Sequence, residues 1–599
     1  MKRKWRFESW LMSRSSRSAR KRATESAAFA GSCVIISRLL QRTSNFHLVN
    51  RSRWRRSRRT YRSLNVIGAQ CRPRPNYKRF GHCAGRPSRQ PRWKSMEIGV
   101  AMSDSLESAR ELIAAARERY QGDAAALTIL NELNDRLDQP LRVALVGSVK
   151  AGKSTLLNGL LGERLAPTDS RESTRVVTWY HYGKTPTVRA RLANGKSVPL
   201  PARRDRDRHE LDLNDLALQD YDRLDVTWPA PGIQGITLID TPGIASISQD
   251  VSNETNRFLL PEQGASGADA VVYLLRSLHE SDIRYLQALD ARTRHGNAAI
   301  GSIAVLSRAD ELGSGRLTAM VSINQAVERL RKHPDLQGVC ETIVPLAGLM
   351  GMGAMTLRQA DYAVLRQLAA LAPEDTNRLL VSAELFITAK GDSLPSERTR
   401  VELVDRFGMY GIRIAIAVIR GGINDASDLA AELLRRSGLD ELRRVIDVHF
   451  TQRQSELKAH SIVHALHRLL RQKPVPGSEE LLVRADEHMS RTHTFTEMQL
   501  LGRIAGQQVK LGASLVNELE RLIGGHGADT ATRLGFEEPQ DNEIMLASAV
   551  EHLQRWRGLL DNPLLDRPTL LACRVAERSC ENIIVALNNE QQVAVMPRG

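Results

Sequence analysis

The segment from Gly147 to Thr155 constrains the fold of this chain more than any other feature of its sequence. It reads Gly-Ser-Val-Lys-Ala-Gly-Lys-Ser-Thr, follows an apolar run at 142–146 and opens a helical pattern at 154–161. A strand, a glycine-rich loop and a helix in this order predict a phosphate-binding loop, because backbone N–H groups can turn inward on the phosphates. Lys153 is expected to reach the β- and γ-phosphates, and the Ser154 hydroxyl to ligate Mg²⁺. The other expected contacts of the loop are Gly147, Val149, Lys150, Ala151, Gly152 and Thr155.

A second motif, Asp240-Thr-Pro-Gly243, ends another apolar strand downstream. Asp240 is expected to hold the Mg²⁺ shell, and the Gly243 N–H to report on the γ-phosphate. The loop between the two motifs is rich in hydroxyl groups, and Thr174 is suited to close on Mg²⁺ and the γ-phosphate as a switch. The hydroxyls that compete for this role are those of Thr168, Ser170 and Ser173.

The base is expected to be selected at Ser307-Arg-Ala-Asp310, directly after the apolar run 303–306. The Asp310 carboxylate can accept hydrogen bonds from guanine N1 and N2, whereas adenine offers no such pair and would leave it unsatisfied. The usual form of this motif has lysine where this chain has Arg308, whose guanidinium plane can still stack over a base. A further contact is expected at Ala347, which ends the last strand.

Short apolar runs separated by Gly, Pro and polar turns predict the strands of one sheet. Helical stretches separate several of them, so the sequence predicts an α/β domain over 140–375, with a mostly parallel sheet and helices on both faces. No strand signal follows that domain. The strands are expected at 142–146, 176–182, 236–239, 271–275, 303–306 and 343–346.

The rest of the folded body is predicted to be helical. Apolar positions near a 3.6-residue period predict one helix over 103–138, and the segment 102–139 is assigned to a helical neck. Residues 376–595 are predicted to form an all-α neck and trunk. Within them, one helix ends at Gly438 and a second is expected over 439–471, about 50 Å long at about 1.5 Å per residue. Such a helix needs partners along its apolar face, and the candidates are 480–523, 541–560 and 569–589.

The first 101 residues differ in composition from the rest of the chain. They contain 26 basic and three acidic residues, a net charge of +23, whereas residues 102–599 contain 59 basic and 65 acidic residues, a net charge of −6. A segment so rich in Arg and Ser is expected to be disordered. It could be a basic arm for nucleic acid or anionic lipid, a transit-like peptide, or upstream sequence translated from a start codon called too early. The helix start after Met102 favours the last interpretation.

Histidines and cysteines offer weaker signals. His460, His464 and His467 share one helical face and could bind zinc, but no fourth ligand is apparent, and surface polar contacts are the favoured interpretation. Cys573 and Cys580 are expected to be buried small apolar residues. None of the cysteines has CxxC spacing, which argues against a zinc ribbon or a disulfide framework and favours a reducing cytosol.

The motifs together resemble those of bacterial dynamin-like proteins. More narrowly, the chain is similar to the isoniazid-inducible dynamin-like GTPases of mycobacteria, and most of all to their protein C group. The resemblance covers nearly all of 102–599 and none of 1–101. It is carried by residues 140–185, by Ser307-Arg-Ala-Asp-Glu-Leu-Gly, Arg406-Phe-Gly-Met-Tyr-Gly-Ile and Ala431-Glu-Leu-Leu-Arg-Arg-Ser-Gly-Leu, and by Ile523-Gly-Gly-His-Gly.

This resemblance implies a GTPase head on a helical neck and trunk, with GTP as substrate and Mg²⁺ as cofactor. It also implies nucleotide-dependent self-association through the head, a sister dynamin-like partner and a link to cell-envelope stress. The protein would then be cytoplasmic and peripheral, acting on the lipid surface at the inner face of the cell membrane. No nucleic acid is expected to bind the folded body, which is net acidic.

Two residues of the loop depart from the dynamin pattern. Eukaryotic dynamins carry Gln and Ser where this chain has Val149 and Lys150. Val149 cannot orient a water molecule, and neither can Ile244 after the second motif, so slow hydrolysis is expected. Some relatives hold a monovalent cation at the position of Lys150, whose ammonium group either supplies that charge in cis or is simply solvated at the loop rim. The residues expected to take part in catalysis are Lys153, Ser154, Thr174 and Lys150.

These observations favour a GTPase that couples hydrolysis to movement of a helical stalk against a bilayer. The turn at 472–480 could be the membrane tip, although it lacks the apolar cluster that would insert into lipid. Two alternatives stay open: an RNA- or ribosome-associated GTPase, and a nucleotide-binding scaffold with negligible turnover. The longest apolar run, 412–419, is too short to span a bilayer.

Overall fold

The computed structural model describes most of the chain beyond residue 103. Thr174, Gly243 and the Arg-rich segment 1–101 lie outside the described residues. The residues that the structure describes are 104–166, 177–192, 196–200, 202–205, 208–211, 221–241, 258–259, 266–276, 280–294, 301–311, 319–336, 339–491 and 493–595.

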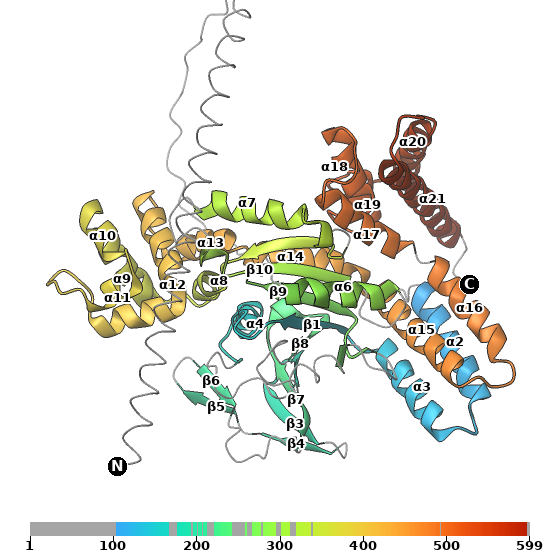
Figure 1. Ribbon diagram of the computed structural model, residues 1–599, viewed down its shortest axis with the longest axis horizontal. Coiled ribbons are helices and arrows are strands. Elements are labelled where there is room, and N and C mark those ends of the chain that lie inside the picture. The colour runs from blue at the N-terminus through green and yellow to red at the C-terminus, as the bar shows by residue number, and fades with distance from the viewer. Residues whose placement is uncertain are drawn as a thin grey trace, which may run out of the picture. The chain divides into compact units, whose positions relative to one another are not determined.

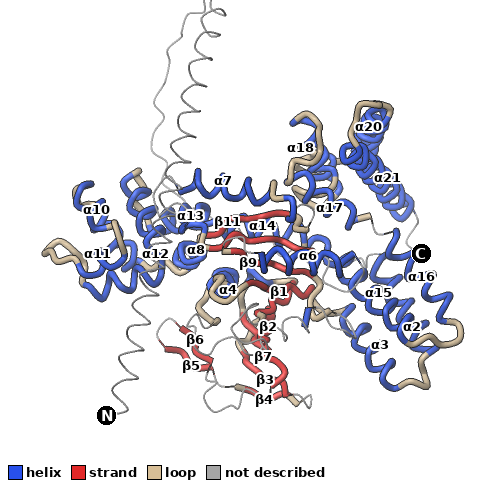
Figure 2. The backbone as a smooth tube through the Cα atoms, viewed as in Figure 1, coloured by secondary structure: helices blue, strands red, loops and turns tan. Residues whose placement is uncertain are grey.

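A single large sheet organises the nucleotide-binding part of the chain (Figures 1 and 2), with strand order β11-β10-β9-β1-β8-β2-β7-β3-β4. Strands β11, β10, β9, β1 and β8 are parallel to one another, and β2 pairs antiparallel with β8. All the predicted strands are confirmed. Their bounds are β1 (Leu141–Gly147), β2 (Val177–Tyr182), β8 (Ile236–Asp240), β9 (Ala270–Leu275), β10 (Gly301–Ser307) and β11 (Thr342–Leu346).

The sequence did not reveal the antiparallel end of the sheet. There β7 (Tyr221–Trp228) lies parallel to β2 and antiparallel to β3 (Thr187–Leu192), which pairs with β4 (Ser197–Pro199). A separate hairpin joins β5 (Ala202–Asp205) and β6 (Arg208–Leu211). In β3 only alternate residues are buried, so the strand lacks the continuous apolar run that marks the parallel strands.

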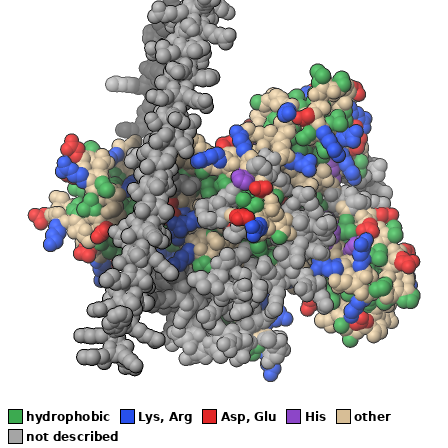
Figure 3. Space-filling view, viewed as in Figure 1, with side chains coloured by type: hydrophobic (Ala, Val, Ile, Leu, Met, Phe, Trp, Pro, Cys, Tyr) green, Lys and Arg blue, Asp and Glu red, His purple; other side chains and the backbone are tan. Residues whose placement is uncertain are grey.

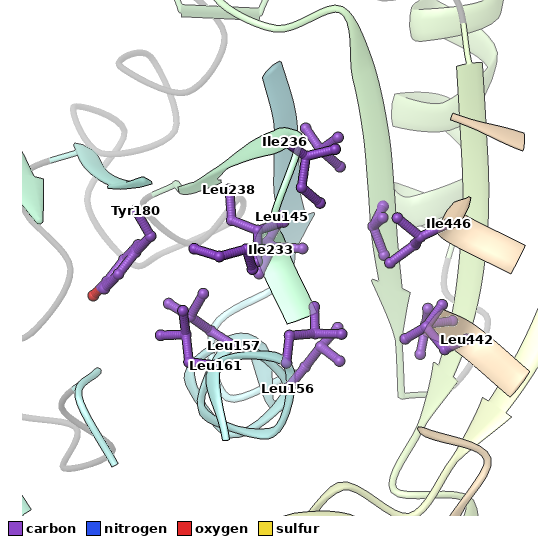
Figure 4. Close-up of a cluster of buried hydrophobic side chains, with 14 of the residues drawn as sticks. Leu145, Leu156, Leu157, Leu161, Tyr180, Ile233, Ile236, Leu238, Leu442 and Ile446 are labelled. Atoms are coloured by element: carbon purple, nitrogen blue, oxygen red, sulfur yellow. The ribbon is translucent and has the colours of Figure 1, made fainter. Parts of the chain in front are cut away.

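Helices cover both faces of the sheet, as predicted. On one face α4 (Lys153–Leu161) packs on alternate residues of β1 and β8, and α14 (Leu439–His449) lies against β11 and α4. Figure 4 shows Leu156 and Leu157 of α4 beside Leu145 and Leu238 of these strands. On the other face α6 (Glu280–Arg294) and α7 (Ala319–Arg331) pack against the intervening residues, such as Val146.

Four helices from distant parts of the sequence share one apolar core. They are α2 (Asp104–Arg119), α3 (Ala124–Leu137), α15 (Gln454–Gln472) and α16 (Ser478–Arg491). The prediction of one helix over 103–138 was therefore wrong: the chain turns between Tyr120 and Asp123, and Asp123 caps α3 by accepting from the Ala126 N–H at 2.9 Å. The turn lets both helices pack on α15.

The predicted long helix over 439–471 is also two helices, α14 and α15, separated by the 3₁₀ turn η6 (Thr451–Arg453). Phe450 at the break is fully buried in the core under the sheet, and a Cβ on Gly301 would lie only 2.6 Å from its ring. Arg453 donates to the carbonyls of Ile523 and Gly524 at 2.9 and 3.0 Å. A straight helix could not direct both side chains to these partners.

A third helical cluster lies directly after the last strand. It contains α8 (Gly348–Met355), α9 (Gln359–Ala369), α10 (Pro373–Leu379), α11 (Ala383–Thr388), α12 (Glu397–Arg420) and α13 (Ala426–Ser437). Helix α12 is kinked at Gly408, whose φ of 65° is in the left-handed region. The motif beginning at Arg406 is part of this core, since Arg406 forms a buried ion pair with Asp361 at 3.1 Å.

The last helices form a fourth core. The predicted partner 480–523 is divided into α16, α17 (Thr494–Ala505) and α18 (Ala513–Leu522), whereas α20 (Asn542–Leu560) and α21 (Arg567–Val595) match the other two predictions. Helices α17, α18, α20 and α21, with α19 (Thr530–Leu534), enclose Cys573 and Cys580, both fully buried as expected. Within the part of the chain that the structure describes, no helix is long and apolar enough to cross a membrane.

The histidines of α15 are less exposed than the sequence suggested. His460 is only 9% exposed, and its ring centroid lies 4.2 Å from that of His464 and 4.0 Å from that of Phe495. The expected surface setting is therefore wrong for His460. His467 lies 3.1 Å from a carboxylate oxygen of Asp486. Among the described residues no group of three or more His, Cys, Asp or Glu side chains is placed to hold a metal ion.

Lys and Arg side chains alternate with Asp and Glu over the described part of the face in Figure 3. This mixed surface agrees with the slightly acidic charge balance of residues 102–599. It provides no large field of one sign on that face, which is the feature that attracts nucleic acids electrostatically.

We expect stability to fall as the pH drops from about 6.5 toward 4. Burial, with the charge of neighbouring histidines, lowers the pKa of His464 to about 4 and that of His460 well below its ordinary value. Over this range the unfolded chain takes up protons that the folded bundle refuses, which costs up to about 3 kcal/mol for His464. Thermal unfolding followed by circular dichroism from pH 7 to 4.5 measures the slope.

The variant His464→Gln should flatten that slope, because glutamine does not titrate. His526→Gln is the matched control, since His526 is exposed. Equal slopes for wild type and His464→Gln would contradict the expectation.

Candidate functional site

The predicted site residues follow the carboxyl ends of parallel strands. The loop at 147–155 follows β1, Asp240 ends β8, Asp310 follows β10 and Ala347 follows β11. Because β1 pairs in parallel with β8 on one side and β9 on the other, the order of connections reverses at β1. Ligands of open α/β sheets bind in the crevice at such a point. The structure therefore brings phosphate-binding and base-binding candidates to one edge.

The phosphate-binding loop is shaped by two glycines and one lysine. A Cβ on Gly147 would lie 2.6 Å from the Leu274 carbonyl oxygen, so only glycine fits there. Gly152 has a φ of 96° and open space where its Cβ would be, which leaves room for a ligand beside the backbone. The Lys153 ammonium donates to the carbonyls of Gly147 and Ser148 at 3.1 and 3.4 Å, so it folds back over the loop.

The electrostatic setting of Lys153 suits an anion. Burial lowers its pKa, while the Asp240 carboxylate opposes that shift. Helix α4 begins at Lys153, so the positive end of the helix dipole and its free N–H groups add to the lysine charge. Ser154 and Thr155 occupy the first turn and are half-buried. These features fit the phosphates of a nucleotide.

Asp240 fits the predicted role of a cation ligand. It is 6% exposed, and its Oδ1 atom is buried without a hydrogen bond from any described residue. Burial raises its pKa to about 6, with Lys153 opposing the shift. A buried carboxylate oxygen without a partner is costly, and Mg²⁺ prefers carboxylate and hydroxyl oxygens. Asp240 and Ser154 would hold this ion, which would neutralise phosphate charge when bound.

Thr241, the residue after Asp240, fixes the position of the end of β8. The Thr241 hydroxyl donates to the Leu145 carbonyl oxygen at 2.8 Å and is fully buried. This hydrogen bond ties the end of β8 to the end of β1. Gly243 and the predicted switch residue Thr174 lie outside the described residues, so their roles stay predictions.

Asp310 lies in the 3₁₀ turn η4 (Ala309–Glu311) after β10. Burial raises the pKa of its carboxyl group, and the Arg308 charge opposes this. Ser307 supports the turn, because its hydroxyl donates to the Leu275 carbonyl at 3.0 Å. Arg308 has a φ of 51° and pairs with Glu311 at 2.9 Å. Stacking of the guanidinium over a base, as the sequence suggested, therefore requires that pair to open.

Ala347 connects the base side of the site with the helical cluster. Its N–H donates to the Ser437 carbonyl at the end of α13, at 2.9 Å. Position 438, directly after Ser437, requires glycine, because a Cβ on Gly438 would lie 2.1 Å from the Pro345 carbonyl oxygen. Gly348 in turn lies against Thr155 of α4. Sequence reasoning did not reveal this contact of α13, since nothing local in residues 431–437 indicates a partner loop.

Two loop residues bear on catalysis. Val149 is 48% exposed at the loop rim and offers no group that could orient a water molecule. Lys150 is exposed and has a φ of 63°, a left-handed conformation that non-glycine residues adopt only at some cost. The exposed lysine agrees with either interpretation of its ammonium group.

Comparison with known proteins gives consistent results. Residues 143–289 match the dynamin family. The isoniazid-induced protein IniC of Mycobacterium tuberculosis is 38% identical over 466 residues, which cover 78% of this chain and 94% of that protein. The isoniazid-induced protein IniA of the same species is 29% identical over 211 residues, covering 32% of this chain and 31% of IniA.

A solved structure described as an oligomerised bacterial dynamin pair that senses and tethers membranes also matches. It is 13% identical, with a TM-score of 0.29, and the match covers 82% of this chain and 75% of that chain.

Substitution of Lys150 tests the cis-charge hypothesis. If the ammonium group supplies the charge, GTP turnover by the wild type should not depend on K⁺. Turnover by Lys150→Ala should fall about 10-fold in Na⁺- and K⁺-free buffer and recover when K⁺ is added. Alanine pays a similar backbone cost at this φ, so the comparison isolates the side chain.

Phosphate release measured across K⁺ concentrations provides the readout. Lys184→Ala, at another exposed lysine, is the control and should behave as wild type. If GTP turnover by the wild type requires K⁺ or Na⁺ and turnover is unchanged in Lys150→Ala, the hypothesis is wrong.

Proposed function

The chain belongs to the dynamin family, among the bacterial dynamin-like proteins related to IniC, and from this premise we propose a function. In this proposal the protein binds and hydrolyses GTP with Mg²⁺. It couples that cycle to self-association and to remodelling of a membrane at the inner face of the cell envelope. The observation that carries the enzymatic part is the meeting of the 147–155 loop, Asp240 and Asp310 at one edge of the sheet.

Each group in this arrangement has a definable task. The loop N–H groups and Lys153 bind the phosphates, and Asp240 with Ser154 provides oxygens for Mg²⁺. Asp310 selects guanine over adenine by accepting from N1–H and N2–H. Thr174 and Gly243 are proposed to sense the γ-phosphate.

Turnover is proposed to be slow in the isolated protein. Phosphoryl transfer to water depends on a group that positions the water, and Val149 occupies the loop position where such a group would be expected. Association of two heads could complete the site, as an additional charge supplied by a partner does in other GTPases. A sister dynamin-like protein is a second proposed partner, since IniA is similar to part of this chain.

The contact between Ala347 and α13 supports a route by which movement at the nucleotide site reaches the helices. The base-side loop is hydrogen-bonded to the carbonyl end of α13, and α14 starts directly after it at Leu439. Movement of this loop on nucleotide binding would therefore displace a helix junction and not only a surface loop.

The turn between α20 and α21 is a better candidate for membrane contact than residues 472–480. Leu564 in this turn is 89% exposed, and Leu565 beside it is partly buried. The turn at 472–480 is instead held by polar contacts, because Lys473 pairs with Asp123 at 2.8 Å. An exposed leucine at the end of a helical hairpin can insert into the headgroup region of a bilayer.

A nucleotide-binding scaffold with negligible turnover is the second candidate function. The side chain of Val149 favours it, because the same loop that binds phosphate lacks a water-orienting group. The two candidates differ in one measurable property, the release of phosphate.

Phosphate release by the full-length protein with GTP and with ATP tests the proposal. We expect slow release with GTP that rises when vesicles of anionic phospholipid are added, and little release with ATP. Lys153→Ala, which lacks the phosphate-binding ammonium, should abolish both binding and release. Tight GTP binding without any release, alone or with vesicles, would leave the scaffold as the function.

Leu564→Asp tests the membrane contact. A charge at the turn should reduce the fraction of protein that floats with anionic vesicles by several-fold, because inserting an aspartate into the headgroup boundary is unfavourable. Val381→Asp is the control, since Val381 is 70% exposed on a different helical cluster. Equal flotation of wild type and Leu564→Asp would contradict the assignment of this turn.

A further inference from the structure

The antiparallel end of the sheet has a polar face that the proposed function does not use. Strands β2, β7, β3 and β4 form the end of the sheet opposite β11 (Figure 2). Arg189 of β3 lies opposite Asp225 of β7, and directly paired residues share one face of a sheet. Two residues further along β3, Arg191 lies opposite Arg223. The alternate residues of β3, such as Val188, are buried in the core on the other face.

Trp179 of β2 holds two arginines on this polar face. The guanidinium carbon of Arg142, from β1, lies 4.7 Å from the centroid of the Trp179 ring, and that of Arg223 lies 4.1 Å from it. Trp179 itself is 5% exposed and belongs to the apolar core of the sheet. An aromatic ring attracts a cation placed over it. Both guanidinium groups are therefore fixed in position before any partner binds.

Cations outnumber carboxylates on this face. Arg223 is the one arginine there that pairs with a carboxylate among the described residues, with Asp225 at 3.1 Å. Arg142 donates instead to the side-chain oxygen of Gln139 at 2.6 Å, and Arg189 to a hydroxyl oxygen of β4 at 3.1 Å. Both of these acceptors are neutral. The face thus carries positive charge that the sheet itself does not balance.

Arg191 gives the clearest sign of a missing anion. It is exposed and lies directly opposite Arg223. Like charges in this position destabilise a pair of strands, and a neutral side chain would avoid that cost. An anionic group that contacts both guanidinium groups would replace the repulsion with attraction.

We propose that this basic sheet face, formed by Arg142, Arg189, Arg191 and Arg223, binds an acidic segment of a partner protein. A guanidinium group presents a planar pair of donors that matches a carboxylate. Arg189 and Arg191 are two residues apart on one strand, a separation of about 7 Å. Alternate side chains of an extended acidic segment have the same spacing. None of these arginines belongs to the nucleotide site, so the surface adds to the proposed function and does not depend on it.

A protein segment fits this face better than a lipid surface does. Contact with a bilayer requires exposed apolar side chains beside the cations. The large apolar residues that are exposed on the described parts of these strands, Tyr182 and Val198, alternate onto the opposite face. The basic sheet face therefore offers guanidinium groups without an apolar anchor.

Hydrogen exchange of the full-length protein, followed by mass spectrometry, tests the proposal. This method locates binding along the chain, so it separates the basic sheet face from the Arg-rich first 101 residues. The probe is an octapeptide of alternating Glu and Ser at low ionic strength. We expect it to protect β3 and β7, whereas an octapeptide of alternating Lys and Ser should not. Arg191→Gln and Arg142→Gln should each raise the concentration for half-maximal protection about 10-fold, as for a lost hydrogen bond to a charged group.

Two controls separate binding from folding and from general charge. Arg117→Gln, at an exposed arginine of α2, should bind the acidic octapeptide as the wild type does. Arg191→Gln without peptide should unfold at the same temperature as the wild type or higher, because the repulsion from Arg223 is removed.

Three results would each overturn the proposal. They are no protection of β3 and β7 by the acidic octapeptide, an equal loss of binding in Arg117→Gln, and stronger protection by oligothymidylate or by vesicles of anionic phospholipid. All measurements are made without nucleotide, so their outcome is independent of whether the protein hydrolyses GTP.

Discussion

The parallel pairing of β1 with both of its neighbours is the constraint on which the rest of the structure depends. Hydrogen bonds to β8 and β9 place the carboxyl ends of these strands in register at one edge of the sheet. The loop after β1 can then fold tightly only because Gly147 passes within a few ångströms of Leu274 on β9. The strand register, the close approach of Gly147 to Leu274 and the shape of the phosphate-binding loop therefore follow from one backbone arrangement.

The helical clusters are joined to this edge by backbone contacts. Ser437 accepts from Ala347, and Gly438 passes too close to Pro345 for any side chain. Such contacts have little freedom to adjust, because a backbone carbonyl cannot adopt another rotamer. A shift at the base-side loop and a shift of the α13–α14 junction are thus the same event, which is what a nucleotide-driven movement of helices requires.

The sequence predicted the parts of the fold that depend on local signals. The strands around β1, the loop at 147–155 and the start of α4 follow from apolar runs and glycine spacing within a few residues. The helix breaks at Gly122 and at Phe450 could not be predicted in this way. At Phe450 the break is set by partners far away in sequence, the backbone of Gly301 and the carbonyls of Ile523 and Gly524.

The candidate site shows the same division. Asp240 and Asp310 follow strands and were identified from their motifs, whereas the hydrogen bond from Ala347 to Ser437 joins segments far apart in the sequence and has no local signal. The motif beginning at Arg406 was recognised only as a resemblance. In the structure it supplies the buried ion pair with Asp361 and the kink of α12.

The hydrogen bonds of Arg453 have a consequence for how the chain can be divided. Arg453 is 3% exposed, and its guanidinium donates to the carbonyls of Ile523 and Gly524. A fragment that ended before residue 523 would leave a cation in an apolar interior without those acceptors. The segment from residue 523 onward is therefore a structural requirement of the turn between α14 and α15, and not an appendage that could be exchanged between relatives like a separate domain.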